Sequence, residues 1–177
     1  MTGIDELQEK LRQVRVLVLD VDGVMTDGKL YFDANGRELK AFHSRDGHGI
    51  KLAQAAGIEV AIISGRESGA VMARAANLGI EHCILGSLTK GEAIESLAGK
   101  LDEPLARFAA MGDDIIDLPM LRRAGVAATV PDAPEIVKTH ADWISEQRGG
   151  DGAVRSFIEV LLQAQGSWDR VTARYLS

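Results

Sequence analysis

Short aliphatic segments that each end in a polar or acidic residue recur along this chain of 177 residues. Residues 14–19 read Val-Arg-Val-Leu-Val-Leu and stop at Asp20, and residues 59–63 stop at Ser64. Runs of this length, rich in β-branched residues, are typical of strands covered on both faces. Because helical patterns separate them, the sequence predicts an α/β protein with a Rossmann-like three-layer fold, whose mainly parallel sheet carries helices on both faces.

The remaining segments follow the same alternation. A turn-rich stretch at residues 33–36 predicts a β-hairpin inserted after the first strand. The expected elements use all of the chain between Asp22 and Asp113, so we expect a capless fold without a lid domain. Further strands are expected at residues 82–85, 107–111, 126–130 and 142–144, hairpin strands at 29–31 and 38–42, and helices at 49–56, 68–78, 90–98 and 153–163.

Composition and charge limit the class of protein. The length and an apolar fraction of 46% fit one globular domain over residues 1–177, with a C-terminal tail at about 166–177. The formal charge of −6, without a Lys- and Arg-rich run, argues against a nucleic-acid partner. A single cysteine, Cys83, excludes an intramolecular disulfide. Without a long apolar run or a secretory signal, we expect a cytoplasmic protein with no membrane partner.

Polar and charged residues follow three of the expected strands at the point where each strand ends. Asp20 and Asp22 follow the first strand, Ser64 follows the second, and Asp113 follows the fourth. Lys90 opens the helix before that fourth strand. In open parallel sheets, ligands bind at the carboxyl ends of the strands, where strand order reverses. We therefore expect these residues to form one site.

Asp20 and Asp22 lie two apart on an extended segment, so both carboxylates can face one side. Two carboxylates held close repel each other unless a cation lies between them, and Mg²⁺ prefers such hard oxygen ligands. One carboxylate can then attack a bound phosphate while the other acts as general acid and base. The alternative for an isolated Asp-x-Asp-Gly is that either residue only caps a turn before Gly23.

The other strand-end residues fit a phosphate and a metal ion, and each also has a simpler interpretation. Ser64 and the backbone beside Gly65 can hold phosphate oxygens at a helix start, or Ser64 can be an N-cap. Lys90 can balance the charge of the phosphate, although a single lysine is usually solvated. Asp113 and Asp114 can complete a metal site, or can belong to an acidic helix start.

These motifs resemble those of the haloacid dehalogenase superfamily, over residues 14 to about 166. The resemblance implies that the first aspartate is the nucleophile, and that the second is the general acid and base and gives its backbone carbonyl to Mg²⁺. An acid/base aspartate favours a phosphatase over a dehalogenase. The motifs are Asp20-Val-Asp22-Gly-Val, Ile63-Ser64-Gly65, Lys90 and Gly112-Asp113-Asp114-x-x-Asp117. The implied assignments are Asp20, Asp22, Ser64 and Lys90 as catalytic residues and Asp20, Asp22 and Asp113 as metal ligands.

Longer segments are similar to the 3-deoxy-D-manno-octulosonate 8-phosphate phosphatase family, at residues 20–28, 42–49, 63–66, 112–119 and 149–155. Members are small, capless enzymes of lipopolysaccharide biosynthesis, and form tetramers in which neighbouring subunits help to close each active site. The resemblance implies a homotetramer, Mg²⁺ as cofactor and a small anionic sugar phosphate as substrate. The implied substrate-binding residues, some from an adjacent subunit, are His43, Ser44, Arg45, Asp46, Gly47, Lys51, Ser64, Gly65, Arg66, Arg74 and Lys90.

Two rival functions share part of this pattern. A phosphatase of a nine-carbon keto sugar acid 9-phosphate has the same catalytic motifs, but such enzymes tend to carry Glu at the position of Arg66. A non-catalytic phosphatase-like oligomerisation domain is the alternative of another class, and the intact catalytic aspartates argue against it. Arg66 and Arg74 are eight residues apart, so we expect both on one helix face at the active-site end.

Apolar residues of the hairpin also have two interpretations. They can contact other subunits, as exposed apolar patches often do, or they can pack on their own sheet. The residues concerned are Leu30, Tyr31, Phe32, Leu39 and Phe42.

Overall fold

The computed structural model describes residues 3–176. Residues 1–2 and 177, the first and last positions of the expected domain and tail, lie outside the described part. Six strands form one sheet in the order β5-β4-β1-β6-β7-β8, and all neighbouring pairs are parallel. The predicted α/β fold is therefore confirmed. The strands are β1 (Val16–Leu19), β4 (Glu59–Ile63), β5 (His82–Ile84), β6 (Phe108–Met111), β7 (Val126–Thr129) and β8 (Trp143–Ile144).

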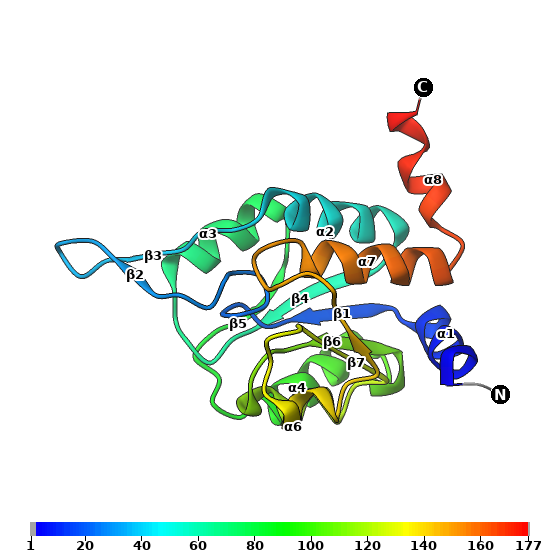
Figure 1. The fold of residues 1–177 in the computed structure, drawn as a ribbon, viewed down its shortest axis with the longest axis horizontal. Helices are drawn as coiled ribbons and strands as arrows, with labels where there is room; N and C mark the ends of the chain where they lie inside the picture. The colour runs from blue at the N-terminus through cyan, green and yellow to red at the C-terminus, as the bar shows by residue number, and fades with distance from the viewer. Residues whose placement is uncertain (1–2, 177) are drawn as a thin grey trace.

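Helices cover both faces of this sheet, which gives the expected three layers (Figure 1). α2, α3 and α7 lie on one face, and α4 and α6 lie on the other. Because the chain runs from β1 to β5 in one direction and from β6 to β8 in the other, right-handed crossovers put the two sets of helices on opposite faces. The helices are α2 (Ser44–Ala56), α3 (Gly69–Leu78), α4 (Lys90–Leu101), α5 (Leu118–Leu121), α6 (Glu135–Lys138) and α7 (Ala153–Ala164).

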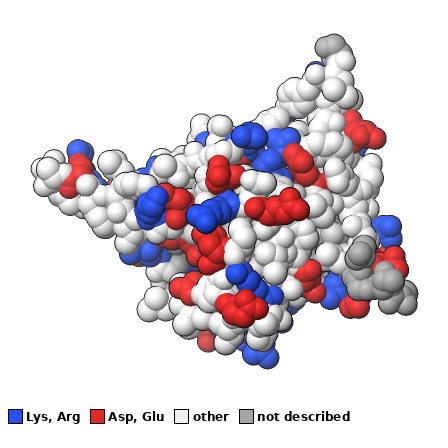
Figure 2. All heavy atoms as spheres, in the orientation of Figure 1, with Lys and Arg blue, Asp and Glu red and all other residues white. Residues whose placement is uncertain are grey.

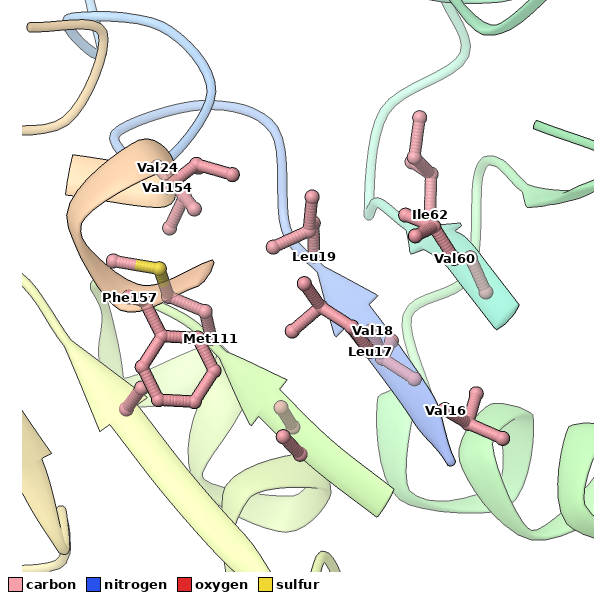
Figure 3. Close-up of a cluster of buried hydrophobic side chains, with 14 of the residues drawn as sticks. Val16, Leu17, Val18, Leu19, Val24, Val60, Ile62, Met111, Val154 and Phe157 are labelled. Carbon is pink, nitrogen blue, oxygen red and sulfur yellow. The ribbon is translucent and has the colours of Figure 1, made fainter. Parts of the chain in front are cut away.

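The central strand β1 fixes the position of Asp20, the residue directly after it. All four residues of the strand are buried, and burying each large apolar side chain contributes roughly 1.5–3 kcal/mol. The backbone N–H of Asp20 donates to the carbonyl of Met111 on β6 at 3.0 Å. Figure 3 shows the packing partners of β1, among them Val60 and Ile62 of β4, Met111 of β6, and Val154 and Phe157 of α7.

A two-stranded hairpin, β2 (Tyr31–Phe32) and β3 (Glu38–Leu39), follows β1 and projects from the body of the molecule (Figure 1). Phe42 is partly buried and packs against the hydrophobic core of its own chain. The other four apolar residues, Leu30, Tyr31, Phe32 and Leu39, are exposed. Within residues 3–176 the hairpin is the insertion between β1 and α2, and no separate lid domain is formed.

Several helices differ from the expectation. α2 begins at Ser44 rather than at residue 49, because Gly47 and Gly49 interrupt the helical sequence pattern but allow close contact with neighbouring elements. A Cβ at Gly49 would touch Arg155 of α7. The short helices α5 and α6 and two terminal helices were not expected, and none of the described helices is long and apolar enough to cross a membrane. The terminal helices are α1 (Gly3–Gln13) and α8 (Trp168–Thr172).

Candidate active site

A cavity of 410 Å³ lies at the carboxyl ends of β1, β4 and β6, beside the point where strand order reverses. This is the position at which open parallel sheets bind ligands. Asp114, Gly28, Leu88 and Ile116 contribute to its wall. Six of the residues assigned to catalysis, metal binding or substrate binding line it together: Asp20, Asp22, Ser64, Gly65, Arg66 and Asp113.

The loop after β1 is closed around the side chain of Thr26. The Thr26 hydroxyl accepts hydrogen bonds from the N–H groups of Gly23 and Gly28 at 3.4 and 3.2 Å, and donates to the carbonyl of Val21 at 3.3 Å. This side chain is 2% exposed. The hydroxyl therefore fixes the turn that carries Asp22, a contribution that the sequence did not reveal.

Two glycines before α7 support the same loop from behind. The Gly150 N–H donates to the carbonyl of Val24 at 3.0 Å. A Cβ at Gly149 would overlap the carbonyl oxygen of Gly23, so only glycine permits this approach. Glycines that allow close contact between backbones are typical of such positions. Their spacing in the sequence carried no signal for this contact.

Lys90 is buried beneath the cavity between two carboxylates. Its ammonium donates to Asp20 Oδ1 at 2.6 Å and also to Asp117, and its side chain is 1% exposed. Burial alone would lower the pKa of Lys90, but the charges of Asp20 and Asp117 raise it, so the ammonium is kept. Burial and the negative charge of Asp117 raise the pKa of Asp20 to about 7, although Lys90 acts in the opposite direction. The interpretation of Lys90 as solvated surface is therefore wrong.

The acidic residues around Lys90 fit a divalent cation. One carboxylate oxygen from each of Asp20, Asp113 and Asp117 lies within 4.8 Å of the others. Burial and the surrounding carboxylates, Asp20 first, raise the pKa of Asp113 to about 8. One ammonium faces three carboxylates here, and a hard cation would offset the remaining repulsion. A Cβ at Gly23 would overlap the Asp113 carboxylate, so this glycine leaves the space that Asp113 occupies.

Asp117 plays a different part from Asp20 and Asp113. One of its oxygens is paired with Lys90, and the other accepts the N–H groups of Asp113 and Asp114 at 3.0 and 3.1 Å. Both oxygens are thus engaged within the chain, and the side chain is fully buried. Asp117 therefore orients Lys90 and the Asp113 loop, which leaves Asp20 and Asp113 as the available side-chain ligands.

Ser64 follows β4 and is anchored through its backbone. Its N–H donates to the carbonyl of Ile84 at 2.9 Å, and its carbonyl accepts from the N–H of Ser87 at 3.0 Å. The hydroxyl accepts from the N–H of Arg66 at 3.3 Å. α3 begins at Gly69, so Ser64 is neither its N-cap nor at its first turn.

The expectation that Arg66 and Arg74 share one helix face is also wrong, because α3 begins only at Gly69. Arg66 lies in the loop before α3, whereas Arg74 lies within that helix. Spacing along a helix predicts a common face only where both residues are helical. The chain needs five residues to turn from β4 into α3, and the sequence pattern did not show this.

Asp22 is held by residues of the hairpin that the sequence did not identify. Its carboxylate is paired with the ammonium of Lys40, and Arg66 Nε lies 3.7 Å from its second oxygen. Glu38 contacts both cations, at 3.3 Å to Lys40 Nζ and 2.7 Å to Arg66. The spacing of Glu38 and Lys40 was an available signal, because residues two apart on a strand share a face. The Asp22 carboxylate is thus engaged by cations of the chain, and the metal contact through its backbone carbonyl, which the resemblance implies, stays a prediction.

The expected substrate-binding residues on α2 and α3 lie outside this cavity in the single chain. Arg45 lines a second cavity of 470 Å³ with Arg155. Asp46 is buried, and its Oδ1 accepts the N–H of Arg155 in the first turn of α7 at 2.8 Å. Substrate contacts through these residues stay predictions. None of the following lines the cavity that contains Asp20: His43, Ser44, Arg45, Asp46, Gly47, Lys51 and Arg74.

Lys51 and Arg74 also have partners within their own chain. Lys51 donates to the carbonyl of Leu78 at 2.6 Å, which joins the end of α3 to α2. The Arg74 guanidinium lies over the ring of Phe42, 5.7 Å from its centroid. Both side chains therefore stabilise contacts between neighbouring elements of the fold.

Acidic and basic side chains are interspersed on the face shown in Figure 2, and neither kind forms a patch of its own there. At the cavity, selection of an anion would depend on local charges, such as Arg66 and a bound cation.

Comparison with known proteins identifies the family. A family model of haloacid dehalogenase-like hydrolases matches residues 86–158, which include Lys90 and Asp113. The 3-deoxy-D-manno-octulosonate 8-phosphate phosphatase KdsC of Haemophilus influenzae is 43% identical over 160 residues, which cover 90% of this chain and 89% of the relative. The chain belongs to this phosphatase family. The KdsC enzyme of Escherichia coli K12 is 44% identical over 160 residues, 90% of this chain and 85% of that protein.

Solved structures of the family have the same fold. The phosphatase of Moraxella catarrhalis, in complex with a magnesium ion, a phosphate ion and a KDO molecule, matches with a TM-score of 0.95 at 38% identity, over 97% of this chain and 99% of that chain. A cobalt-bound phosphatase of Haemophilus influenzae matches with a TM-score of 0.90 at 42% identity, over 95% and 99% of the two chains. The resemblance inferred from the motifs and the predicted phosphatase class are confirmed.

Proposed function

We propose that this protein is a Mg²⁺-dependent phosphatase that hydrolyses 3-deoxy-D-manno-octulosonate 8-phosphate to the free sugar acid and phosphate. The observation that carries the proposal is the buried pair of Asp20 and Lys90 beside Asp113, at the base of the 410 Å³ cavity. A carboxylate aimed into a cavity, with one ammonium and too few positive charges for its acidic neighbours, suits covalent phosphoryl transfer that requires a divalent cation.

The first chemical step is assigned to Asp20. One carboxylate oxygen of Asp20 attacks phosphorus, a new O–P bond forms, and the bond from phosphorus to the sugar oxygen breaks. Lys90 donates to Oδ1 of Asp20 at 2.6 Å, and we assign the attack to Oδ2. The products of this step are an aspartyl-phosphate on Asp20 and the free sugar acid.

Asp22 is assigned the proton transfers of both steps. It donates a proton to the leaving sugar oxygen and, as a carboxylate, then takes a proton from the water that attacks the aspartyl-phosphate. The O–P bond to Asp20 breaks, phosphate leaves, and Asp20 is restored. General acid–base catalysis of this kind typically contributes about 10²–10⁴-fold to the rate.

The metal ion is assigned to the carboxylates of Asp20 and Asp113 and the backbone carbonyl of Asp22. When bound, Mg²⁺ neutralises charge between these carboxylates and the phosphate, which permits one anion to approach another. Ser64 and the backbone beside Gly65, which line the same cavity, then hold phosphate oxygens. Lys90 supports the charge from below.

The sugar-acid end of the substrate is assigned to Arg66, whose planar guanidinium suits a carboxylate. The KDO molecule named in the Moraxella catarrhalis complex supports an eight-carbon sugar acid over the nine-carbon alternative. From the family resemblance we also infer one domain over the chain with the tail at about 166–177, a cytoplasmic location and a role in lipopolysaccharide biosynthesis.

A homotetramer with intersubunit active sites belongs to the same proposal. The exposed hairpin residues Leu30, Tyr31, Phe32 and Leu39 offer an apolar surface for it. In that assembly the remaining predicted substrate residues, from His43 to Lys51 and Arg74, would reach the cavity of an adjacent subunit.

A substrate panel tests the function. Purified protein with Mg²⁺ is given the eight-carbon and the nine-carbon sugar-acid phosphates, p-nitrophenyl phosphate and glycerol phosphate, and phosphate release is measured. We expect the highest kcat/KM with the eight-carbon substrate. A preference for the nine-carbon substrate would overturn the assignment of the sugar, and no release from any ester would favour the non-catalytic oligomerisation domain.

A further inference from the structure

Lys40, at the base of the hairpin after β3, has a buried cationic side chain. Its side chain is 1% exposed, although it belongs to a segment whose neighbours Leu39 and Ala41 are exposed. Burying an ammonium is costly unless it is paired and hydrogen-bonded. Its partners are the carboxylates of Asp22 and Glu38. The hairpin thus places the ammonium of Lys40 against the loop that carries Asp22, 18 residues earlier in the chain.

The contacts around Asp22 distinguish its two oxygens. Oδ1 is paired with Lys40, whereas Arg66 Nε approaches Oδ2 only to 3.7 Å, which is beyond a hydrogen bond. Arg66 is 46% exposed and makes its short contact with Glu38 instead. Lys40 is therefore the cation in closer contact with the Asp22 side chain, which lines the cavity.

We propose that Lys40 is a positioning residue for Asp22, which holds one carboxylate oxygen so that the other can reach the leaving oxygen of the substrate. The proposal rests on the proposed function, in which Asp22 donates that proton. Misplacement of a catalytic group by as little as an ångström can greatly reduce its contribution. Without Lys40, the Asp22 side chain would sample other rotamers and be drawn toward Arg66.

The main competing explanation is that Lys40 only anchors the hairpin to the body. The two explanations differ in the dependence on the leaving group. An alkoxide leaving group, as from a sugar phosphate, needs a proton in the transition state, whereas p-nitrophenolate leaves without one. Loss of the anchor would disturb the site for every ester, but loss of the positioning would affect esters with poor leaving groups.

The test compares kcat/KM, which covers the steps up to departure of the leaving group. Lys40→Met keeps the length of the side chain and removes the charge. With the eight-carbon sugar-acid phosphate and with glycerol phosphate, we expect kcat/KM to fall about ten- to a hundredfold, part of the usual contribution of a general acid. With p-nitrophenyl phosphate we expect nearly unchanged kcat/KM, which also shows that the variant is folded. Lys40→Arg should restore part of the loss.

Two further variants complete the experiment. Lys29→Met removes an exposed lysine next to the same hairpin, which is paired with Asp27. This variant should leave kcat/KM unchanged for both substrate classes. In an Asp22→Asn background, Lys40→Met should add little further loss with glycerol phosphate, because both changes remove one function. If Lys40→Met does not fold, Lys40→Gln takes its place.

The outcomes separate this proposal from the proposed function. Equal losses on both substrate classes, or full additivity with Asp22→Asn, would show a structural role for Lys40 and leave the phosphatase assignment in place. Unchanged kinetics with all esters would also overturn the role of Lys40. Absence of turnover by the unchanged protein with Mg²⁺ would overturn the proposed function itself, and the role of Lys40 with it.

Discussion

Lys90 Nζ lies 2.6 Å from Asp20 Oδ1, and their side chains are 1% and 6% exposed. A buried ion pair with one further partner, Asp117, leaves little freedom for either side chain. Such pairs often contribute little net stability, because desolvation offsets the attraction. The arrangement is better explained by the orientation it gives to the carboxylate of Asp20, which lines the cavity.

The role of Asp20 predicts the effect of its nearest isostere. Asp20→Asn should abolish turnover of every phosphate ester, because an amide cannot form the acyl phosphate. The fold should persist, since the side chain is nearly the same size and Lys90 can still donate to its oxygen. Steady-state phosphate release measures the first expectation, and thermal unfolding followed by circular dichroism measures the second. Near-normal activity would remove Asp20 from the nucleophile's role.

Metal dependence is the second prediction. EDTA should stop phosphate release and Mg²⁺ should restore it. Asp113→Ala should raise the Mg²⁺ concentration needed for half-maximal activity, because one of two side-chain ligands is lost. Isothermal titration calorimetry with Mg²⁺ measures the loss of metal affinity directly, without turnover. Asp169→Ala, an exposed carboxylate of α8, is the matched control and should leave the titration unchanged. Turnover at the untreated rate in EDTA would contradict the metal assignment.

The raised pKa values predict how pH changes the stability of the metal-free protein. The pKa of Asp113 rises from 3.8 to about 8 and that of Asp20 to about 7, in both cases first because of burial. At pH values between the ordinary pKa of 3.8 and these raised pKa values, the folded state binds more protons than the unfolded state. The free energy of unfolding should therefore fall as pH rises from 4 toward 8. Urea denaturation in EDTA at several pH values measures this slope.

Two comparisons test the cause of that slope. Asp113→Asn removes one of the titrating groups and should make the slope shallower. Saturating Mg²⁺ should also reduce the loss at high pH, because the cation binds the deprotonated carboxylates. A stability of the EDTA-treated protein that rises with pH over this window would contradict the assignment of these pKa shifts.

Much of the site could be predicted because parallel strands end at one edge of a sheet. That rule places Asp20, Ser64 and Asp113 in one site although they are spread over 94 positions of the sequence. To apply it, one needs only to recognise the strands. Lys40 could not be found in the same way. Its contact with Asp22 depends on the path of the hairpin back to the loop, and on burial of a lysine that sequence alone would assign to solvent.

The helices also differ in how well the sequence predicted their bounds. α4 and α7 have a clear apolar stripe and were expected near their observed bounds. α2 has a weak stripe, and its first turn contains Gly47, so its start was placed too late. The contact of α2 with α7 stabilises this turn, and packing between distant segments is not readable from a local pattern.

Gly23 gives the fourth prediction. It has φ of 91°, and a Cβ there would overlap the carboxylate of Asp113. Gly23→Ala should therefore displace Asp113, weaken Mg²⁺ binding and lower kcat/KM for all esters. Gly36→Ala is the control, because Gly36 has φ of 76° but nothing within 4 Å of the added Cβ. The control carries the backbone strain without the collision. Equal changes in Mg²⁺ affinity in both variants would rule out the steric explanation.

The last prediction concerns Arg66 and tests the substrate rather than the chemistry. Arg66 lines the same cavity as Ser64, and 46% of its side chain is exposed. Replacing it with alanine removes a charge-assisted contact worth about 1.5–3 kcal/mol. Arg66→Ala should thus lower kcat/KM for 3-deoxy-D-manno-octulosonate 8-phosphate roughly ten- to a hundredfold.

The same change should cost much less with p-nitrophenyl phosphate, which has no carboxylate to hold. Arg37→Ala, an exposed arginine of the hairpin paired with Asp33, is the matched control and should affect neither substrate. Because Arg66 also contacts Glu38 at 2.7 Å and lies near Asp22, a loss through these neighbours would lower kcat/KM for both esters alike. An equal loss on the two substrates would therefore assign Arg66 to the phosphate or to the loop, and would remove the main local support for a sugar-acid substrate.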